Sequence, residues 1–313
     1  GVSRLLEFTP SGNLPPEAAQ REIRTALDFL AAHPQQLQAV AQQRADALLA
    51  DHQRVREATR DVGQYSVSPC LPVAVMGVYV LLLEGGLFLP DQLEKAAQGR
   101  ASAQSEADYG TPKGVKLKDE YSRAFQIACA QWQHFAAQLE RADVDAAQLT
   151  TAFVHELLRD AFGYAALQAA SAQQVGELRY PVSLMAGTLP VLVAPHTLCL
   201  DEADARFAVQ GGGNRKKAPF QAMQELLNAS EPLHWGIVSN GKQLRLLRDA
   251  ASLTRPSFLE VDLADLLGGQ RYAEFANVWR LLHASRASRL GQGATVCIWE
   301  QWRSEGQQEG TRV

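Results

Sequence analysis

The segment that most constrains the fold is residues 234–248, where two apolar runs flank a turn dipeptide in the string HWGIVSNGKQLRLLR. Asn240-Gly241 favours a type I′ turn, because both residue types tolerate positive φ and the twist of this turn matches the strands it joins. We therefore predict a β-hairpin whose buried first strand begins at Trp235. Apolar residues recur at helical spacing before and after it, so the hairpin is expected at the centre of a mixed α/β domain.

Composition sets broad limits on partners and location. The chain has 313 residues, enough for one large or two small domains, and its net charge of −4 argues against a uniformly basic surface while allowing a local basic patch. The four cysteines lie far apart without metal-ligand spacing, which favours reduced thiols in a cytoplasmic protein. The longest apolar run, residues 73–83, is too short to span a bilayer and no signal peptide is visible, so no membrane is expected.

Changes of pattern along the chain predict an α/β (α+β) fold in five parts. They are a helical hairpin with short strands (1–83), a partly mobile linker (84–115), a helical segment (116–175), a small α/β domain (176–290), and a C-terminal helix (291–313) that leads into a region absent from this chain. Within the linker we expect a short helix with Asp91 near its N-cap. The helical segment should contain helices at 118–139 and 143–162.

The small α/β domain is expected to contain a mixed sheet with flanking helices. Its predicted elements are strands at 179–185 and 189–193, a loop at 195–217, a helix at 219–228, the hairpin, a strand at 257–261 and a helix at 271–286. The sequence shows no internal repeat.

The order strand, strand, helix and hairpin resembles the nuclease-like N-terminal domain of type IIG restriction-modification enzymes and related defence methyltransferases. In active members the second strand ends in Glu-x-Lys, preceded by an Asp, and the carboxylates bind Mg²⁺. Here the corresponding strand reads LPVLVAP at 189–195 and carries neither Glu nor Lys. Asp201, Glu202 and Asp204 follow in a loop without that spacing. The resemblance therefore implies a restriction-nuclease-like sheet with no catalytic and no metal residues assigned, and a Mg²⁺-dependent endonuclease is the weaker alternative.

Several separated strings are similar to the N-terminus of the adenine-specific DNA methyltransferase of class 1 DISARM systems. They lie at 88–97, 107–114, 153–162, 226–228, 247–256 and 302–313. In that family the chain continues into an S-adenosylmethionine loop and an Asn/Asp-Pro-Pro-Tyr motif, and this sequence contains neither. The resemblance implies that S-adenosylmethionine belongs to the missing downstream region, so no cofactor is expected for this chain.

The first part of the chain has a resemblance of its own. The strings RADALLADHQRVR at 44–56, CLP at 70–72 and GVYVLL at 77–82 resemble the extreme C-terminus of Swi/Snf-type helicases from bacterial defence islands. Those tails have an acidic residue shortly after the Leu-Pro pair, where this chain has Ala74. No helicase motor motif is present. A helicase or another defence-system protein is therefore a candidate partner.

The residues that suggest a function directly are basic. Six cations fall in the loop and hairpin of the small α/β domain, namely Arg215, Lys216, Lys217, Lys242, Arg245 and Arg248. Because alternate residues of a strand share a face, Arg245 and Arg248 cannot both join one surface. A partial basic surface suits phosphate contacts with double-stranded DNA, and ordinary solvated charge is the open alternative.

Two functions from different classes remain. The leading hypothesis is a non-catalytic DNA-binding or positioning module of a phage-defence, restriction-modification-like methyltransferase. The alternative is a protein-interaction module that docks a helicase onto a methyltransferase.

Overall fold

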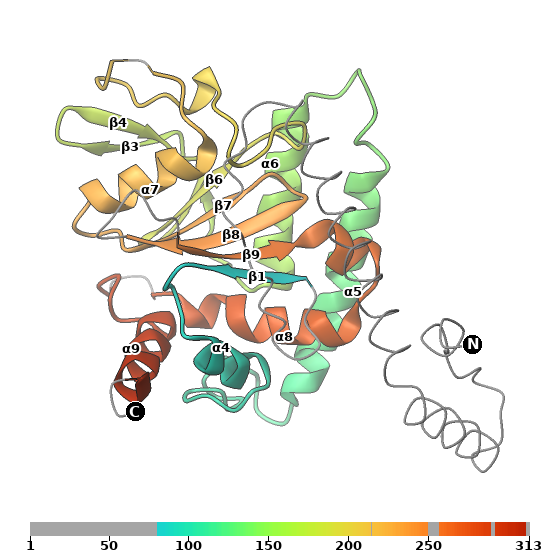
Figure 1. The fold of residues 1–313 in the computed structure, drawn as a ribbon. Coiled ribbons are helices and arrows are strands. Elements are labelled where there is room, and N and C mark those ends of the chain that lie inside the picture. Colours follow the sequence, from blue (N-terminus) through green and yellow to red (C-terminus); the bar gives the residue numbers. More distant parts are fainter. Residues whose placement is uncertain (1–79, 214, 250–256, 289–291, 311–313) are drawn as a thin grey trace, which may run out of the picture. The chain divides into compact units, whose positions relative to one another are not determined.

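A computed structural model of the chain describes residues 80–213, 215–249, 257–288 and 292–310. These residues form an α+β fold around a seven-stranded mixed sheet of order β1-β9-β8-β7-β6-β5-β2, so the predicted fold class is confirmed (Figure 1). Its strands are β1 (Leu81–Glu84), β2 (Gln168–Ala169), β5 (Leu184–Ala186), β6 (Leu189–Val193), β7 (Trp235–Ser239), β8 (Gln243–Arg248) and β9 (Phe258–Asp262).

Strand direction follows from the connections. β6 and β7 are parallel and are joined by the crossover helix α7 (Pro219–Ala229), whereas all other neighbours in this sheet are antiparallel. Two further strands, β3 (Ala172–Val175) and β4 (Leu178–Pro181), form a separate ladder. The strand predicted at 179–185 is thus divided between two sheets. Pro181 lacks the N–H that a continuing ladder needs, and the chain changes sheet after it.

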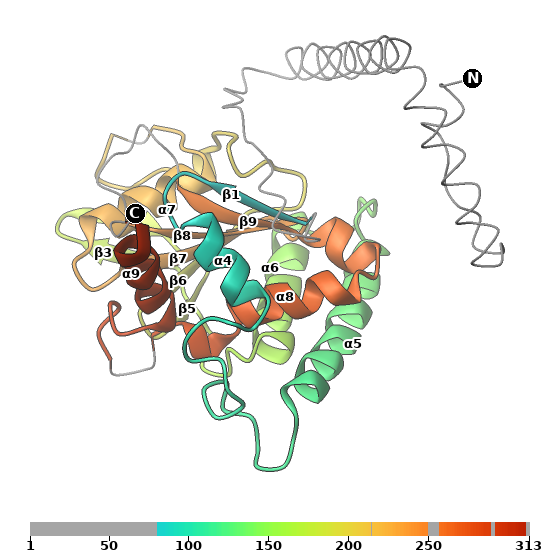
Figure 2. The same cartoon turned by 60° about the horizontal axis from the view of Figure 1, so that its bottom comes forward.

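The two faces of the large sheet are covered differently. The helix α7, the β3–β4 ladder and the loop 194–217 cover one face. The other face packs against five helices, as Figures 1 and 2 show, and these are α4 (Pro90–Ala97), α5 (Leu117–Ala136), α6 (Ala146–Glu156), α8 (Tyr272–Leu282) and α9 (Ile298–Gly310). Successive side chains of β8 point to opposite faces of the sheet: Leu244 and Leu246 face the five helices, and Leu247 faces α7.

The hairpin forms where it was predicted, but the predicted type I′ turn is wrong. Gly241 has φ of 78°, whereas Asn240 is not among the described residues with positive φ. Instead, Asn240 Oδ1 accepts hydrogen bonds from the backbone N–H groups of Lys242 (3.1 Å) and Gln243 (2.8 Å), and its Nδ2 donates to the Leu198 carbonyl at 3.0 Å. These bonds hold Asn240 outside the left-handed region and centre the turn on Gly241-Lys242.

Helix ends agree with the sequence in part. The helix predicted at 143–162 consists of α6, which Asp145 caps by accepting from two backbone N–H groups, and a following π-helix (Leu157–Ala161). Gly163, with φ of 80°, ends it. The N-cap of α4 is Leu89 and the helix begins at Pro90, so Asp91 lies in the first turn, near the N-cap as predicted.

Residues 84–115, predicted as a partly mobile linker, contain the helix α4 and contribute six buried residues to the core, namely Leu87, Phe88, Leu93, Ala96, Ala97 and Tyr109. Tyr109 is buried and stacks on Trp279 with ring centroids 5.2 Å apart. Arg286 is fully buried, lies 4.0 Å from the Tyr109 ring centroid and donates to the Asp108 carbonyl at 2.8 Å. Apolar burial and a buried guanidinium thus hold this polar segment against α8 and the chain that follows it.

The predictions for residues 1–79 lie outside the described residues. They include the helical hairpin and nearly all of the short strands expected within 1–83. Only the end of the apolar run 73–83 is described, as part of β1. In the part of the chain that the structure describes, no helix has the length and apolarity needed to cross a membrane.

His283 should make stability depend on pH. Its ring lies against Trp279, with centroids 4.4 Å apart, and burial together with the charge of Arg286 lowers the His283 pKa to about 4. The unfolded chain, with an ordinary histidine pKa near 6.5, therefore binds this proton first as the pH falls. We expect the free energy of unfolding at pH 7 to exceed that at pH 4 by about 2–3 kcal/mol from this residue.

The check is urea unfolding between pH 7 and pH 4 for the wild type and for His283→Gln. The variant should lose most of the dependence in the window from about 6.5 down to about 4. His134→Gln, at an exposed position, is the matched control and should keep the wild-type profile. An unchanged profile in His283→Gln would contradict the assignment.

Candidate functional site

Arg245, one of the six predicted cations, is a buried structural residue. Its two Nη atoms donate to the two carboxylate oxygens of Asp201, each at 2.7 Å, and its Nε donates to Glu260 at 2.5 Å. The guanidinium also lies 4.3 Å from the centroid of the Phe258 ring. Burial alone would lower the pKa of Arg245, but its bonds with Asp201 and the charge of Glu260 raise it. This charge is largely buried and is neutralised by the two carboxylates.

Arg248 lies on the opposite face of β8, as the alternation predicts. Its Nε and Nη2 donate to the two carboxylate oxygens of Glu300 in α9, at 2.8 and 3.1 Å, and its Nη1 lies 2.5 Å from Asp249 Oδ1. Burial alone would raise the pKa of Glu300, but the hydrogen bond and charge of Arg248 lower it. Arg248 therefore joins the end of the hairpin to α9.

The other four cations are divided between the loop and the turn. Lys217 pairs with Glu225 of α7 at 2.6 Å. Arg215 and Lys216 are exposed and Lys242 is half-buried, and these three form no ion pair with another described residue. The structure thus does not gather the six into one surface. It leaves Arg215 and Lys216 together on the loop and Lys242 at the hairpin turn.

The loop that carries Arg215 and Lys216 is fixed at both sides. Gln210 and Arg179 of β4 exchange backbone hydrogen bonds, each at 3.0 Å, and Asp204 pairs with Lys217 through the backbone. The sequence prediction missed Arg179, which is exposed and lies beside the start of the glycine run. The alternation of residues along the predicted strand was the signal that Arg179 could be exposed. Only the backbone pairing with Gln210 shows that it lies next to this loop.

The expected nuclease strand is apolar in the structure as well. All five residues of β6 are buried, and its neighbour β5 contributes Leu184, Met185 and Ala186. Asp201 is engaged by Arg245, and Asp204 accepts from Arg206, whose side-chain and backbone hydrogen bonds lower the Asp204 pKa to about 2. Within residues 80–310 as described, no group of three or more His, Cys, Asp or Glu side chains could hold a metal ion. This geometry lends the endonuclease alternative no support.

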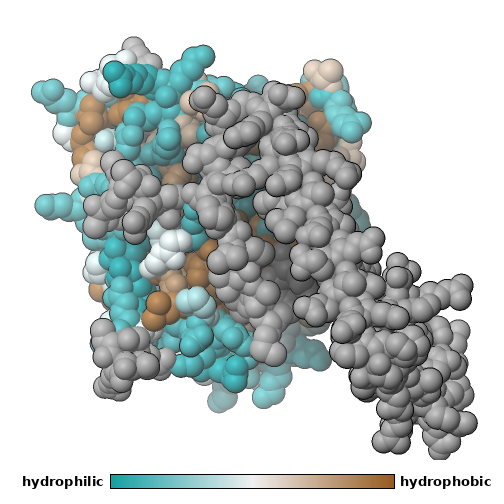
Figure 3. All heavy atoms as spheres, in the orientation of Figure 1, coloured by the Kyte–Doolittle hydropathy of each residue, from teal (hydrophilic) through white to brown (hydrophobic). Residues whose placement is uncertain are grey.

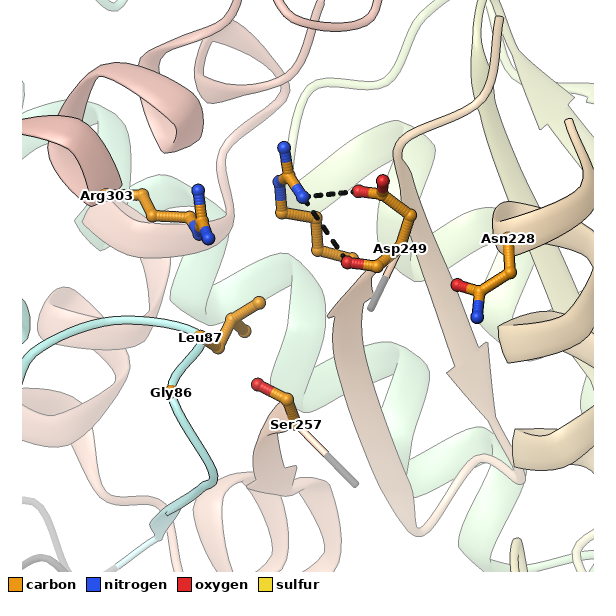
Figure 4. A pocket seen from close by; sticks show the side chains of 7 residues that line it. Gly86, Leu87, Asn228, Asp249, Ser257 and Arg303 are labelled. Atoms are coloured by element: carbon orange, nitrogen blue, oxygen red, sulfur yellow. Dashed lines mark hydrogen bonds and ion pairs between the residues drawn. The ribbon is translucent and has the colours of Figure 1, made fainter. Parts of the chain in front are cut away.

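A pocket that the sequence did not reveal lies where several elements end. It has a volume of about 480 Å³. Figure 4 shows the side chains that line it, and the lining residues are Gly86, Leu87, Asn228, Arg248, Asp249, Ser257 and Arg303. We call it the Arg303 pocket. It brings Arg248 beside a second arginine from α9, 55 positions later in the chain.

The visible surface is mixed in character. Figure 3 shows the face of the molecule seen in Figure 1. Hydrophilic residues cover much of its described surface, with hydrophobic ones scattered among them. Three large hydrophobic residues are exposed among the described ones, namely Leu89, Tyr272 and Val296.

Comparison with known proteins gives one match. A family model described as a domain of unknown function, DUF8741, matches residues 1–85. Most of this stretch lies outside the described residues, and it ends just after β1. No curated protein and no solved structure matches the chain.

Proposed function

We propose that the described domain is a non-catalytic DNA-binding module that positions duplex DNA for a restriction-modification-like methyltransferase of a phage-defence system. The observation that carries the proposal is the pair of exposed cations Arg215 and Lys216, which form no ion pair with another described residue, on a loop anchored to the sheet layer. The order β5, β6, α7 and the β7–β8 hairpin is the order that the family resemblance implies. The apolar β6 supports a binding role without cleavage.

The contacts expected from these residues are with phosphates. Arg215 and Lys216 have long side chains with no fixed hydrogen bond to another described residue, so they can follow a backbone but cannot hold a fixed orientation towards base edges. Arg179 lies beside the loop and can add to the same field, whereas Lys242 at the hairpin turn would be a separate phosphate contact. Binding should therefore be sensitive to salt and indifferent to sequence.

The test is a charge reversal measured at two salt concentrations. Changing Arg215, Lys216 and Lys242 to Glu should weaken the binding of all duplexes alike and reduce the log–log salt slope by roughly three, about one unit for each phosphate contact. The matched control reverses Lys113, Lys116 and Lys118, which are also exposed, and gives the same change in net charge. It should bind like the wild type. Equal affinities for the two triple variants, or no wild-type binding at low salt, would remove the basic loop as a DNA site.

The protein-interaction module remains a second candidate because of β1. The stretch that matches the family model ends just after this strand, and β1 pairs with β9 over four residues from Leu81 to Glu84. In this reading, deletion of residues 1–79 abolishes binding to a Swi/Snf-type helicase partner, whereas the triple reversal leaves that binding unchanged.

A further inference from the structure

The Arg303 pocket is assembled from five separate segments. They are the loop after β1, the end of α7, the end of β8, the start of β9 and one face of α9. Figure 4 shows Arg303 on one side and Asn228 on the other, with Leu87, Asp249 and Ser257 between them. Gly86 adds room, since a Cβ built at this position meets no atom within 4 Å. The space can therefore accept a small polar molecule.

Its walls contain hydrogen-bond donors that make no bond with a described residue. Arg248 is occupied by Glu300 and Asp249, but Arg303 makes a single bond, from Nη1 to Glu300 Oε1 at 3.4 Å. The remaining N–H groups of Arg303 make no bond with any described residue, and neither does the hydroxyl of Ser257. A half-buried guanidinium with most of its donors unused is expected to take an anionic ligand.

The arrangement of the charged groups leaves Arg303 as the available cation. Two guanidinium groups and the carboxylate of Asp249 line the pocket; Arg248 is paired with Asp249 at 2.5 Å and with Glu300 at 2.8 Å, whereas Arg303 has only the 3.4 Å contact with Glu300. The planar fork of an arginine binds two oxygens of a phosphate at once, and a hydroxyl can donate to a third. Arg303 and Ser257 offer this combination.

We infer that the Arg303 pocket binds a phosphate monoester group, held by Arg303 with Ser257. The site is distinct from the proposed DNA surface, because Arg248 lies at the opposite end of β8 from Lys242 at the hairpin turn. Such a group can come from a small phosphorylated molecule or from the phosphorylated end of a nucleic acid strand. The chemistry in the pocket is the same for both.

The experiment titrates the full chain with inorganic phosphate by calorimetry. Arg303→Gln should weaken binding at least about tenfold, since a hydrogen bond to a charged group contributes about 1.5–3 kcal/mol and each tenfold corresponds to about 1.4 kcal/mol. Ser257→Ala should weaken it about threefold or more. The matched control is Arg123→Gln, because Arg123 pairs with Glu120 at the same i,i+3 spacing as Arg303 with Glu300. It should bind like the wild type.

Further titrations identify the source of the phosphate. Adenosine monophosphate stands for small molecules, and a short oligonucleotide with a 5′-phosphate is compared with the same strand ending in a 5′-hydroxyl. Loss of binding in Arg303→Gln for either phosphorylated probe supports the site and names its ligand. No binding of any phosphate by the wild type, or equal binding by Arg303→Gln, overturns it. Unchanged duplex binding by Arg303→Gln keeps this outcome separate from that of the proposed DNA surface.

Discussion

Replacing Arg245 with Met should lower the free energy of unfolding by about 3–5 kcal/mol, a far larger effect than the loss of a surface cation. The substitution keeps much of the side-chain volume against Phe258 but leaves Glu260, which is largely buried, without its positive partner. An uncompensated charge in the interior costs more than the pair contributed when intact. Urea unfolding at pH 7 measures the difference.

Two further variants test this explanation. Arg245→Met combined with Glu260→Leu removes both charges and should recover most of the lost stability. Arg206→Met breaks the exposed Arg206–Asp204 pair and should cost less than about 1 kcal/mol. A loss in Arg245→Met as small as that in Arg206→Met would mean that Arg245 is solvated after all, and it would return this residue to the DNA-binding surface.

The fold was predictable where the signal is local. The hairpin, α7 and the helices at 117–136 and 272–282 follow from apolar spacing and turn residues within short windows. Strand partners were not predictable in this way. The pairing of β1 with β9 joins residues that lie from 174 positions (Glu84 and Phe258) to 180 positions (Leu81 and Val261) apart, and no local pattern specifies it.

For the candidate DNA-binding site, the sequence predicted which residues carry positive charge but not which of them are exposed. Arg245 and Lys216 look alike in sequence, and their difference lies in partners: Asp201 precedes Arg245 by 44 positions, and Glu260 follows it by 15. The contact of segment 98–114 with Arg286 was not predictable for the same reason, since Arg286, which donates to the Asp108 carbonyl, lies far along the chain. The Arg303 pocket depends on five segments at once, so its lining could not be inferred from spacing.

Trp235→Ala should also lower the free energy of unfolding by about 3–5 kcal/mol, as large-to-small changes in a core do. The indole is 3% exposed, and its ring lies 5.8 Å from Phe88 and 5.3 Å from Trp299, measured between ring centroids. Its Nε1 donates to Glu300 Oε2 at 3.2 Å. One side chain therefore joins the loop after β1, the first hairpin strand and α9, and its removal leaves a cavity among three elements.

The shift of the urea midpoint checks this, with Tyr272→Ala as the control, because Tyr272 is 36% exposed and should lose much less stability. The loss of stability in Trp235→Phe should lie between those of the two alanine variants, since phenylalanine keeps most of the ring contact but cannot donate the bond to Glu300. A trivial midpoint shift in Trp235→Ala would mean that the residue is exposed and the hairpin is misplaced. Because Glu300 also holds Arg248 and contacts Arg303, Trp235→Ala should weaken phosphate binding at the Arg303 pocket together with stability, whereas Tyr272→Ala should leave that binding unchanged.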